Sequence, residues 1–411
     1  LGSLPDLLTQ QSNVNQLDRQ IATGQTMLGA TADPAGAGLS LQTADAVQHF
    51  AYDAGNAESA AQTIGTTLSA LQQVADVIDQ LRQTAVEGAS AATTASMRAG
   101  LVAVAQNALQ QLMALGNTQG ADGSYVFAGS NAKSAPFVTA ADGQIAFVGD
   151  GATNAVEIAP GLSVPVTVSG QGIFMNIPAG KEGVAVVAQG TNTGSAYALA
   201  QGVTDLGQLT AARLAGTQYE IAFGAGSGGA LTYTVASGAG SPGTSGFAAS
   251  SGTIASGSFS PGADLRFAGL DVAIDGTPAA GDKFVVEPGA TASLFTTVQD
   301  LIAALAPPPA GQPASSQAQQ QIENVIANLD GAQNSVLSAE ASLGATLAQI
   351  EGVRAQDQTQ GTDAAAALTN LQSADLPQVL ANYSAGVTAL QAAELAFARI
   401  QNLTLFSVIR S

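Results

Sequence analysis

The sequence predicts an α+β protein in which a discontinuous long helical rod, a coiled-coil-like bundle of N- and C-terminal segments, carries an inserted β-rich domain. Both ends of the chain repeat apolar residues every three or four positions, which is typical of helices. The middle alternates apolar and polar residues between turn residues, which is typical of short strands. We therefore expect residues 1–131 to form the N-terminal half of the rod, 132–290 the inserted outer domain and 291–411 the C-terminal half.

The N-terminal part, from Leu4 to about Gly120, is rich in Ala, Gln and Leu and has helical spacing. One helix is expected from about Thr94 to Leu115. In the helix before it, apolar residues alternate between steps of four and three, which is the seam of a helix packed lengthwise against another. That seam contains Ile64, Leu68, Leu71, Ala75 and Ile78.

The middle of the chain, between about Tyr125 and Glu287, is rich in Gly, Pro and Asp around short alternating segments. We expect the Gly/Ser stretch from Ser237 to Gly262 to be a mobile loop within this β region. The expected strands are SYVFAG, QIAFVG, AVEIAP, VPVTVSG, YEIAFG, LTYTV, DVAIDG and KFVVEP.

Helix returns at Ser293–Leu305, and Pro307–Pro309 end it. It resumes near Ser316 and follows a heptad seam from Ile322 to Val353, as in helices packed nearly parallel over a long distance. An amphipathic helix in a globular bundle would explain any one seam, but four seams at the two ends favour the rod. Each buried Leu or Ile in such a seam contributes roughly 1.5–3 kcal/mol.

The last expected helix carries an apolar stripe on one face and mostly Ala, Gln, Ser and Asn on the other. Such a terminal helix needs another helix to pack against, in its own chain or in a neighbour, so it indicates assembly rather than chemistry. We therefore predict an assembly interface along the helical seams. Its residues are Ile64, Leu68, Leu71, Ile78, Val336, Leu343, Ile350, Val387, Leu390, Phe397 and Ile400.

The composition excludes several classes of function. Asp and Glu outnumber Lys and Arg by 30 to 11, a formal charge of −19, so we expect neither nucleic acid nor an anionic membrane surface as a partner. The chain has no Cys, hence no disulfide and no thiolate metal site. The sequence shows no basic and apolar signal segment and no apolar run long enough for a bilayer span. Because it starts with Leu1 rather than Met, we expect a trimmed N-terminus.

Two motifs could suggest chemistry. GAGSGG at Gly224–Gly229 fits a dinucleotide-binding pattern, but the segment that follows it, LTYTV, predicts a strand rather than the required helix, so a hairpin loop is expected. A catalytic triad or zinc site would have to be built on His49, the single histidine, which is expected to be a partly exposed helix residue. We predict no enzyme activity, no catalytic residue and no cofactor.

Four Asp/Gly pairs are expected to form β-turns, with Asp accepting backbone hydrogen bonds and Gly taking positive φ. None has the alternating acidic spacing of a calcium loop, so no metal site is predicted. The pairs are Asp142-Gly143, Asp150-Gly151, Asp275-Gly276 and Gly281-Asp282.

The segment ALTNLQSADLPQVLANYSAGVTALQAAELAFARIQNLTLF (Ala367–Phe406) strongly resembles the end of the bacterial flagellar hook-associated protein 3 family, the hook–filament junction proteins, which are related to flagellin. LDRQIATGQTMLGATADPAGAGLSLQ (Leu17–Gln42) resembles the early segment of that family. GSYVFAGSNAKSAPF (Gly123–Phe137) is similar to its passage from helical to β domain, and GTPAAGDKFVVEP (Gly276–Pro288) to one of its β elements. The resemblance is strong in both terminal parts and weak in the middle.

This resemblance implies a structural subunit of the flagellum, an adaptor that joins hook to filament through packing of its terminal helices. It implies extracellular location in the flagellum, after type III export without a cleaved signal peptide. The implied partners are copies of the chain in a ring, another hook-associated protein on the hook side, flagellin on the filament side and an export chaperone.

Two features depart from the family pattern. The family starts with an extra N-terminal helix, part of which we expect to be missing here, and the ending SVIRS after Phe406 differs from the family's ending. A flagellin filament subunit therefore stays open as an alternative. A flagellin-like surface protein that binds polysaccharide is a second alternative, which would need an aromatic-lined groove, although aromatic residues make up only 5% of the chain.

Overall fold

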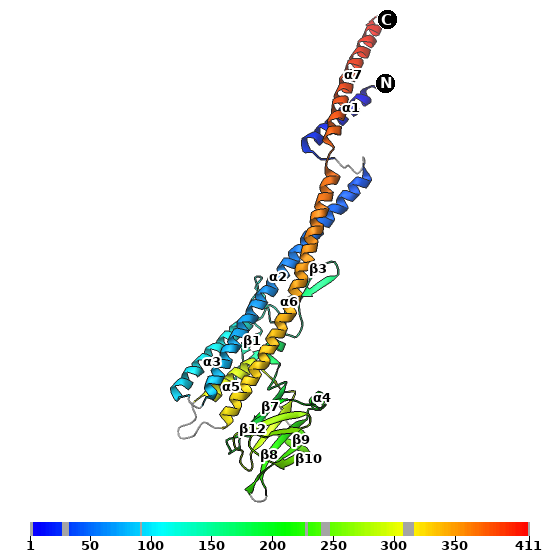
Figure 1. Cartoon of the computed structure of the whole chain (residues 1–411). Coiled ribbons are helices and arrows are strands. Elements are labelled where there is room, and N and C mark those ends of the chain that lie inside the picture. Colours follow the sequence, from blue (N-terminus) through cyan, green and yellow to red (C-terminus); the bar gives the residue numbers. More distant parts are fainter. Residues whose placement is uncertain are drawn as a thin grey trace. The chain divides into compact units, whose positions relative to one another are not determined.

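Long helices at both ends of the sequence flank a β-rich region, which confirms the predicted fold class (Figure 1). The chain divides into two compact units. We call Leu1–Ala57 with Gly352–Ser411 the terminal unit and Glu58–Glu351 the central unit. The computed structural model describes residues 3–26, 33–90, 93–226, 229–239, 247–306 and 316–409.

The helices begin and end close to where the sequence predicts. Thr94 and Ser293 are N-caps: each side-chain oxygen accepts a hydrogen bond from the backbone N–H three residues later. The predicted restart near Ser316 is confirmed, while Pro307–Pro309 lie outside the described residues. The helices are α1 (Ser3–Thr23), α2 (Pro34–Ala89), α3 (Ala95–Gly116), α4 (Leu206–Ala215), α5 (Leu294–Leu305), α6 (Ser316–Gln372), α7 (Leu376–Ile409) and the short π-helix η1 (Gln171–Met175).

All pairings between the described strands are antiparallel, as expected for a region built from short alternating segments. The strands are β1 (Phe137–Thr139), β2 (Ile145–Phe147), β3 (Ala155–Ala159), β4 (Leu162–Pro165), β5 (Ile177–Pro178), β6 (Val184–Ala188), β7 (Tyr197–Val203), β8 (Gln218–Ala225), β9 (Leu231–Ala239), β10 (Ala248–Ser258), β11 (Asp264–Phe267), β12 (Leu270–Asp275), β13 (Lys283–Pro288) and β14 (Thr291–Ala292).

Two sheets of the central unit share one apolar core. Five strands follow the order β10-β9-β8-β13-β6, and three follow the order β11-β12-β7. Their buried side chains meet in one cluster, which α4 also covers. The cluster includes Val186, Leu209, Ile221, Val235, Val272, Ile274 and Phe284.

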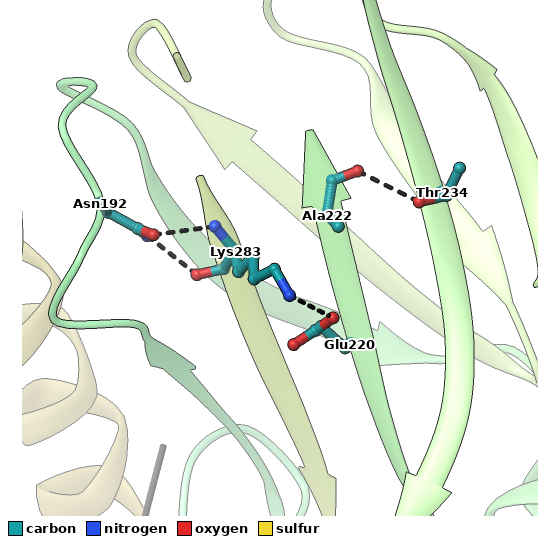
Figure 2. A network of polar contacts seen from close by, with 5 residues as sticks. All are labelled: Asn192, Glu220, Ala222, Thr234 and Lys283. Carbon is teal, nitrogen blue, oxygen red and sulfur yellow. Dashed lines mark hydrogen bonds and ion pairs between the residues drawn. The ribbon is translucent and has the colours of Figure 1, made fainter. Parts of the chain in front are cut away.

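Side-chain amides extend the backbone pairing of this β region (Figure 2). The Asn192 Oδ1 accepts from the Lys283 N–H at 2.8 Å, and its Nδ2 donates to the Lys283 carbonyl at 2.8 Å. The Nζ of Lys283 then pairs with Glu220 on the neighbouring β8 at 3.1 Å. Asn192 thus provides the two hydrogen bonds that a strand neighbour would give at the start of β13.

A second core joins α3 and α5 to the strands β1 and β2. Four buried aromatic rings contact one another there, with neighbouring centroids 5.1 to 5.8 Å apart. Gly116 and Gly170 leave room for them, since a Cβ at either would come within 2.7 Å of the Phe137 ring. The rings are those of Phe127, Phe137, Phe174 and Phe295.

Several strand predictions are wrong. SYVFAG forms turns with isolated bridges, and VPVTVSG is strand only as far as Pro165. The Gly/Ser stretch from Ser237 to Gly262 is not one loop: β9 extends to Ala239, and Ala248–Ser258 forms β10. The backbone pairing with β9 outweighs the low strand propensity of Gly and Ser in β10. Residues 240–246 of that stretch lie outside the described residues.

The structure also contains elements that were not predicted, among them β1, β5, β6, β7, β11, β14, α4 and η1. The strands lie between Phe137 and Ala292, while the two compact units separate within α2 and α6. The three-part division at residues 131 and 290 stays a prediction.

Candidate assembly interface

In the terminal unit, α1 packs along α7 (Figure 1). The two helices approach closely at Gly386, where an added Cβ would lie 3.2 Å from Val14 Cγ2 and 4.0 Å from Leu17 Cδ1. The predicted stripe residues Val387, Leu390 and Phe397 are half-buried. The described part of the chain therefore includes an N-terminal helix, α1, that packs against α7.

Contact with α1 leaves much apolar surface uncovered. Leu4 and Leu8, one turn apart on α1, are 54% and 58% exposed, and Leu395 on α7 is 66% exposed. Leu380 on the same helix is also exposed, whereas its neighbour Val379 is buried. Apolar residues on more than one face of a helix pair favour contact with a further partner, such as another helix.

The other predicted seam residues lie in the central unit and are covered by this chain's own atoms. Arg82 pairs with Asp330 at 3.1 Å, and a Cβ on Gly88 would meet Ile322, so α2 and α6 run antiparallel there. Leu68 is half-buried, and the remaining side chains are at most 5% exposed. The latter are Ile64, Leu71, Ile78, Val336, Leu343 and Ile350.

These six side chains hold the chain's own helices together and do not offer an open surface. Among the predicted interface residues, only those on α7 are in a helix pair that is still largely uncovered. The side chain of Ile400 lies outside the described ones. The role of all eleven residues in assembly stays a prediction.

The exposed leucines of α1 and α7 were not among the predicted interface residues. Leu4 and Leu8 lie on a helix for which no interface residue was predicted, and Leu395 does not fit the three- and four-residue spacing of the α7 stripe. A second apolar face on the same helix was the signal that could have found them.

The motifs that might have suggested chemistry have structural roles. GAGSGG starts at the end of β8 and leads to β9, which pairs antiparallel with β8, as a hairpin requires; Ser227 and Gly228 lie outside the described residues. His49 is exposed on α2, with its Nε2 3.6 Å from Asp45 one turn earlier. Within the described ranges, no group of three or more acidic, histidine or cysteine side chains could hold a metal ion. No helix in the same ranges is long and apolar enough to span a bilayer.

The Asp/Gly pairs serve as turns. Gly143, Gly276 and Gly281 have φ of 83°, 78° and 103°, where a side chain would be strained. The buried Asp282 accepts from the Thr193 N–H at 2.8 Å and the Ala279 N–H at 2.8 Å.

Asp150 joins two loops of the central unit. It accepts a hydrogen bond from the Ser130 N–H at 2.7 Å. Hydrogen bonds from the hydroxyl and backbone of Ser130 lower the pKa of Asp150 below its ordinary value. Asp150 and Asp282 therefore each accept hydrogen bonds from nearby backbone N–H groups.

The aromatic rings are also used structurally. The ring pairs Tyr219–Phe267 and Phe223–Phe259 lie in the core of the two sheets, where all four residues are buried. The second aromatic group fills the core beside α5. These buried rings are therefore not available to line a polysaccharide-binding groove.

Comparison with known proteins agrees with this architecture. Residues 5–132 match the family model described as the bacterial flagellin N-terminal helical region. No curated protein gave a sequence match. Similar solved structures include flagellar hook-associated protein 3 from Legionella pneumophila, with 26% identity, a TM-score of 0.71, and coverage of 81% of this chain and 98% of that one.

Two further structures have the same fold. The flagellar junction protein FlgL from Legionella pneumophila is 24% identical with a TM-score of 0.69, covering 81% of this chain and 99% of that one. FlgL from Xanthomonas campestris is 25% identical with a TM-score of 0.63, covering 76% of this chain and 98% of that one. The flagellin N-terminal region and the shared fold together support a flagellar junction protein of the hook-associated protein 3 type.

Proposed function

We propose that this chain is a structural subunit of the bacterial flagellum, an adaptor between hook and filament that acts by packing its terminal helices and has no catalytic role. The observation that carries the proposal is the fold shared with hook-associated protein 3 over 98% of that chain, together with the flagellin-type N-terminal region. The half-covered pair of α1 and α7 supports it, because its exposed leucines favour contact with further helices.

The proposed partners follow from this role. Copies of the chain would form a ring, with another hook-associated protein on the hook side and flagellin on the filament side. The chain would be exported to the extracellular flagellum without a cleaved signal peptide, held before export by a chaperone. Exposed apolar helices such as α7 are surfaces that a chaperone would need to cover before assembly.

A flagellin filament subunit is the second candidate, because the matching family model is that of flagellin. Electron microscopy of cells that lack the gene separates the two roles. A junction protein predicts hooks without filaments and flagellin lost to the medium. A filament subunit predicts hooks without filaments and no flagellin in the medium.

The double variant Leu390→Asp, Phe397→Asp tests the assembly surface. It places two charges on the half-buried stripe of α7 and is expected to abolish filament growth when it replaces the wild-type protein. The matched control is Gln391→Asp, Ala398→Asp, which has the same spacing on exposed positions of α7 and should leave the contact with α1 intact. Filament growth with the first variant at the wild-type level would reject the stripe as an assembly surface.

A further inference from the structure

Two carboxylates are buried in the pair that α2 and α6 form in the terminal unit. Asp53 on α2 is 8% exposed and Asp357 on α6 is 6% exposed. Acidic residues are almost never this buried in proteins unless they are paired. Neither carboxylate belongs to an ion pair seen between described residues.

The register of the two helices places these residues opposite each other. The Gln372 amide donates to the Ser40 hydroxyl at 3.2 Å. Further along, a Cβ on Gly361 would lie 3.3 Å from the Phe50 Cβ. The two helices thus run antiparallel here, since contacts that lie later on α2 lie earlier on α6. One turn beyond the approach of Phe50 and Gly361, this register places Asp53 opposite Asp357.

The environment of Asp357 disfavours a negative charge. Its Oδ2 is buried and has no hydrogen-bond partner among the described residues. Burial raises the pKa of Asp357 above its ordinary value, and the negative charge of Asp53 raises it further. A deprotonated Asp357 would therefore face both poor solvation and a like charge.

The other charged groups nearby lie on the same two helices. His49, one turn before Asp53 on α2, is exposed and close to Asp45. Arg354, one turn before Asp357 on α6, is exposed and has interactions of its own. Asp53 and Asp357 are therefore the two buried carboxyl groups of the contact.

We propose that Asp53 and Asp357 form a proton-binding site that makes the pairing of α2 with α6 in the terminal unit depend on pH. Protonation of Asp357 removes one of the two facing negative charges and gives its carboxyl an O–H donor. Loss of that proton leaves two facing negative charges, which weakens the pairing.

The direction of the pH effect follows from the raised pKa. The folded unit binds the Asp357 proton more tightly than the unfolded chain does. The resulting stabilisation is complete below the ordinary value of 3.8 and is lost as pH rises through the higher pKa of the folded state. The helix pair is therefore expected to be more weakly held at neutral pH than in mild acid.

Carboxyl carbon-13 NMR titration of the full chain tests the site directly. Asp357 should titrate above the ordinary aspartate value of 3.8. Asp53→Asn should move the titration of Asp357 to lower pH, because it removes the facing charge. An Asp357 that titrates at the ordinary aspartate value would overturn the proposal, and so would one that does not respond to Asp53→Asn.

Thermal unfolding followed by circular dichroism gives an independent result. Asp357→Asn should raise the unfolding midpoint of the terminal helices at neutral pH and flatten its dependence on pH. Asp363→Asn is the matched control and should change neither. Equal behaviour of these two variants would contradict the proposal, and the NMR test of Asp53→Asn applies even where Asp357→Asn does not fold.

Discussion

The side chain of Gln320 on α6 pairs with both backbone groups of Ala198 on β7. Its Oε1 accepts from the Ala198 N–H at 2.6 Å, and its Nε2 donates to the Ala198 carbonyl at 2.8 Å. The same Nε2 lies 3.3 Å from the carbonyl of Val186 on β6. One amide on α6 thus serves the edge strands of both sheets, as Asn192 serves the start of β13.

Gln320→Leu should destabilise the central unit. Gln320 is 2% exposed, so Leu would leave the Ala198 N–H and carbonyl without partners in a buried place. Each unsatisfied group costs about 1–3 kcal/mol. Urea unfolding should show a lower midpoint for this variant.

Gln317→Leu is the control for that experiment. Gln317 also lies on α6 and donates to the Gly190 carbonyl at 3.1 Å, but this hydrogen bond is exposed, so water can replace the side chain. An equal loss of stability in the two variants would show that burial of the Gln320 amide is not the cause.

The seam of α6 gives a second prediction. Leu343 is buried, and truncation of a buried Leu alone costs about 2–5 kcal/mol. Leu343→Asp adds the cost of a buried charge, so the helical signal in circular dichroism should be lost at a lower temperature. The β signal should persist to higher temperature, because the two sheets have their own core.

Leu337 provides the matched position on the same helix. Its side chain is 50% exposed, so Leu337→Asp should change stability by no more than about 0.5 kcal/mol. Similar unfolding of both variants would mean that Leu343 does not contribute to the packed seam.

The helical parts were predictable because their packing repeats along the sequence. The seams around Ile64 and Leu343 need only local spacing to be recognised, and α3, α5 and the start of α6 lie where the sequence places them. The strand β10 was not predictable, because its Gly- and Ser-rich sequence gains its structure from pairing with β9.

The roles of the buried polar side chains could not be predicted from the sequence, for a different reason. Gln320 lies in a run of Gln and Ala that resembles a solvated helix face, and only the position of β6 and β7 makes it a buried anchor. Asp53 and Asp357 are far apart in sequence, and their positions opposite each other follow from the register of two long helices.

The contact of α1 with α7 gives the last prediction. Gly386 lies where the two helices approach closely, and even a Cβ there would be 3.2 Å from Val14. Gly386→Leu should push α1 away from α7, and a lone helix of this length is marginal in water. Hydrogen exchange should then become faster throughout α1.

Ala385→Leu is the control, because it adds the same side chain at the adjacent, exposed position of α7, and it should leave exchange in α1 unchanged. Unchanged exchange in both variants would mean that α1 is held by something other than its contact at Gly386, whereas faster exchange in both would point to a general effect of Leu on α7.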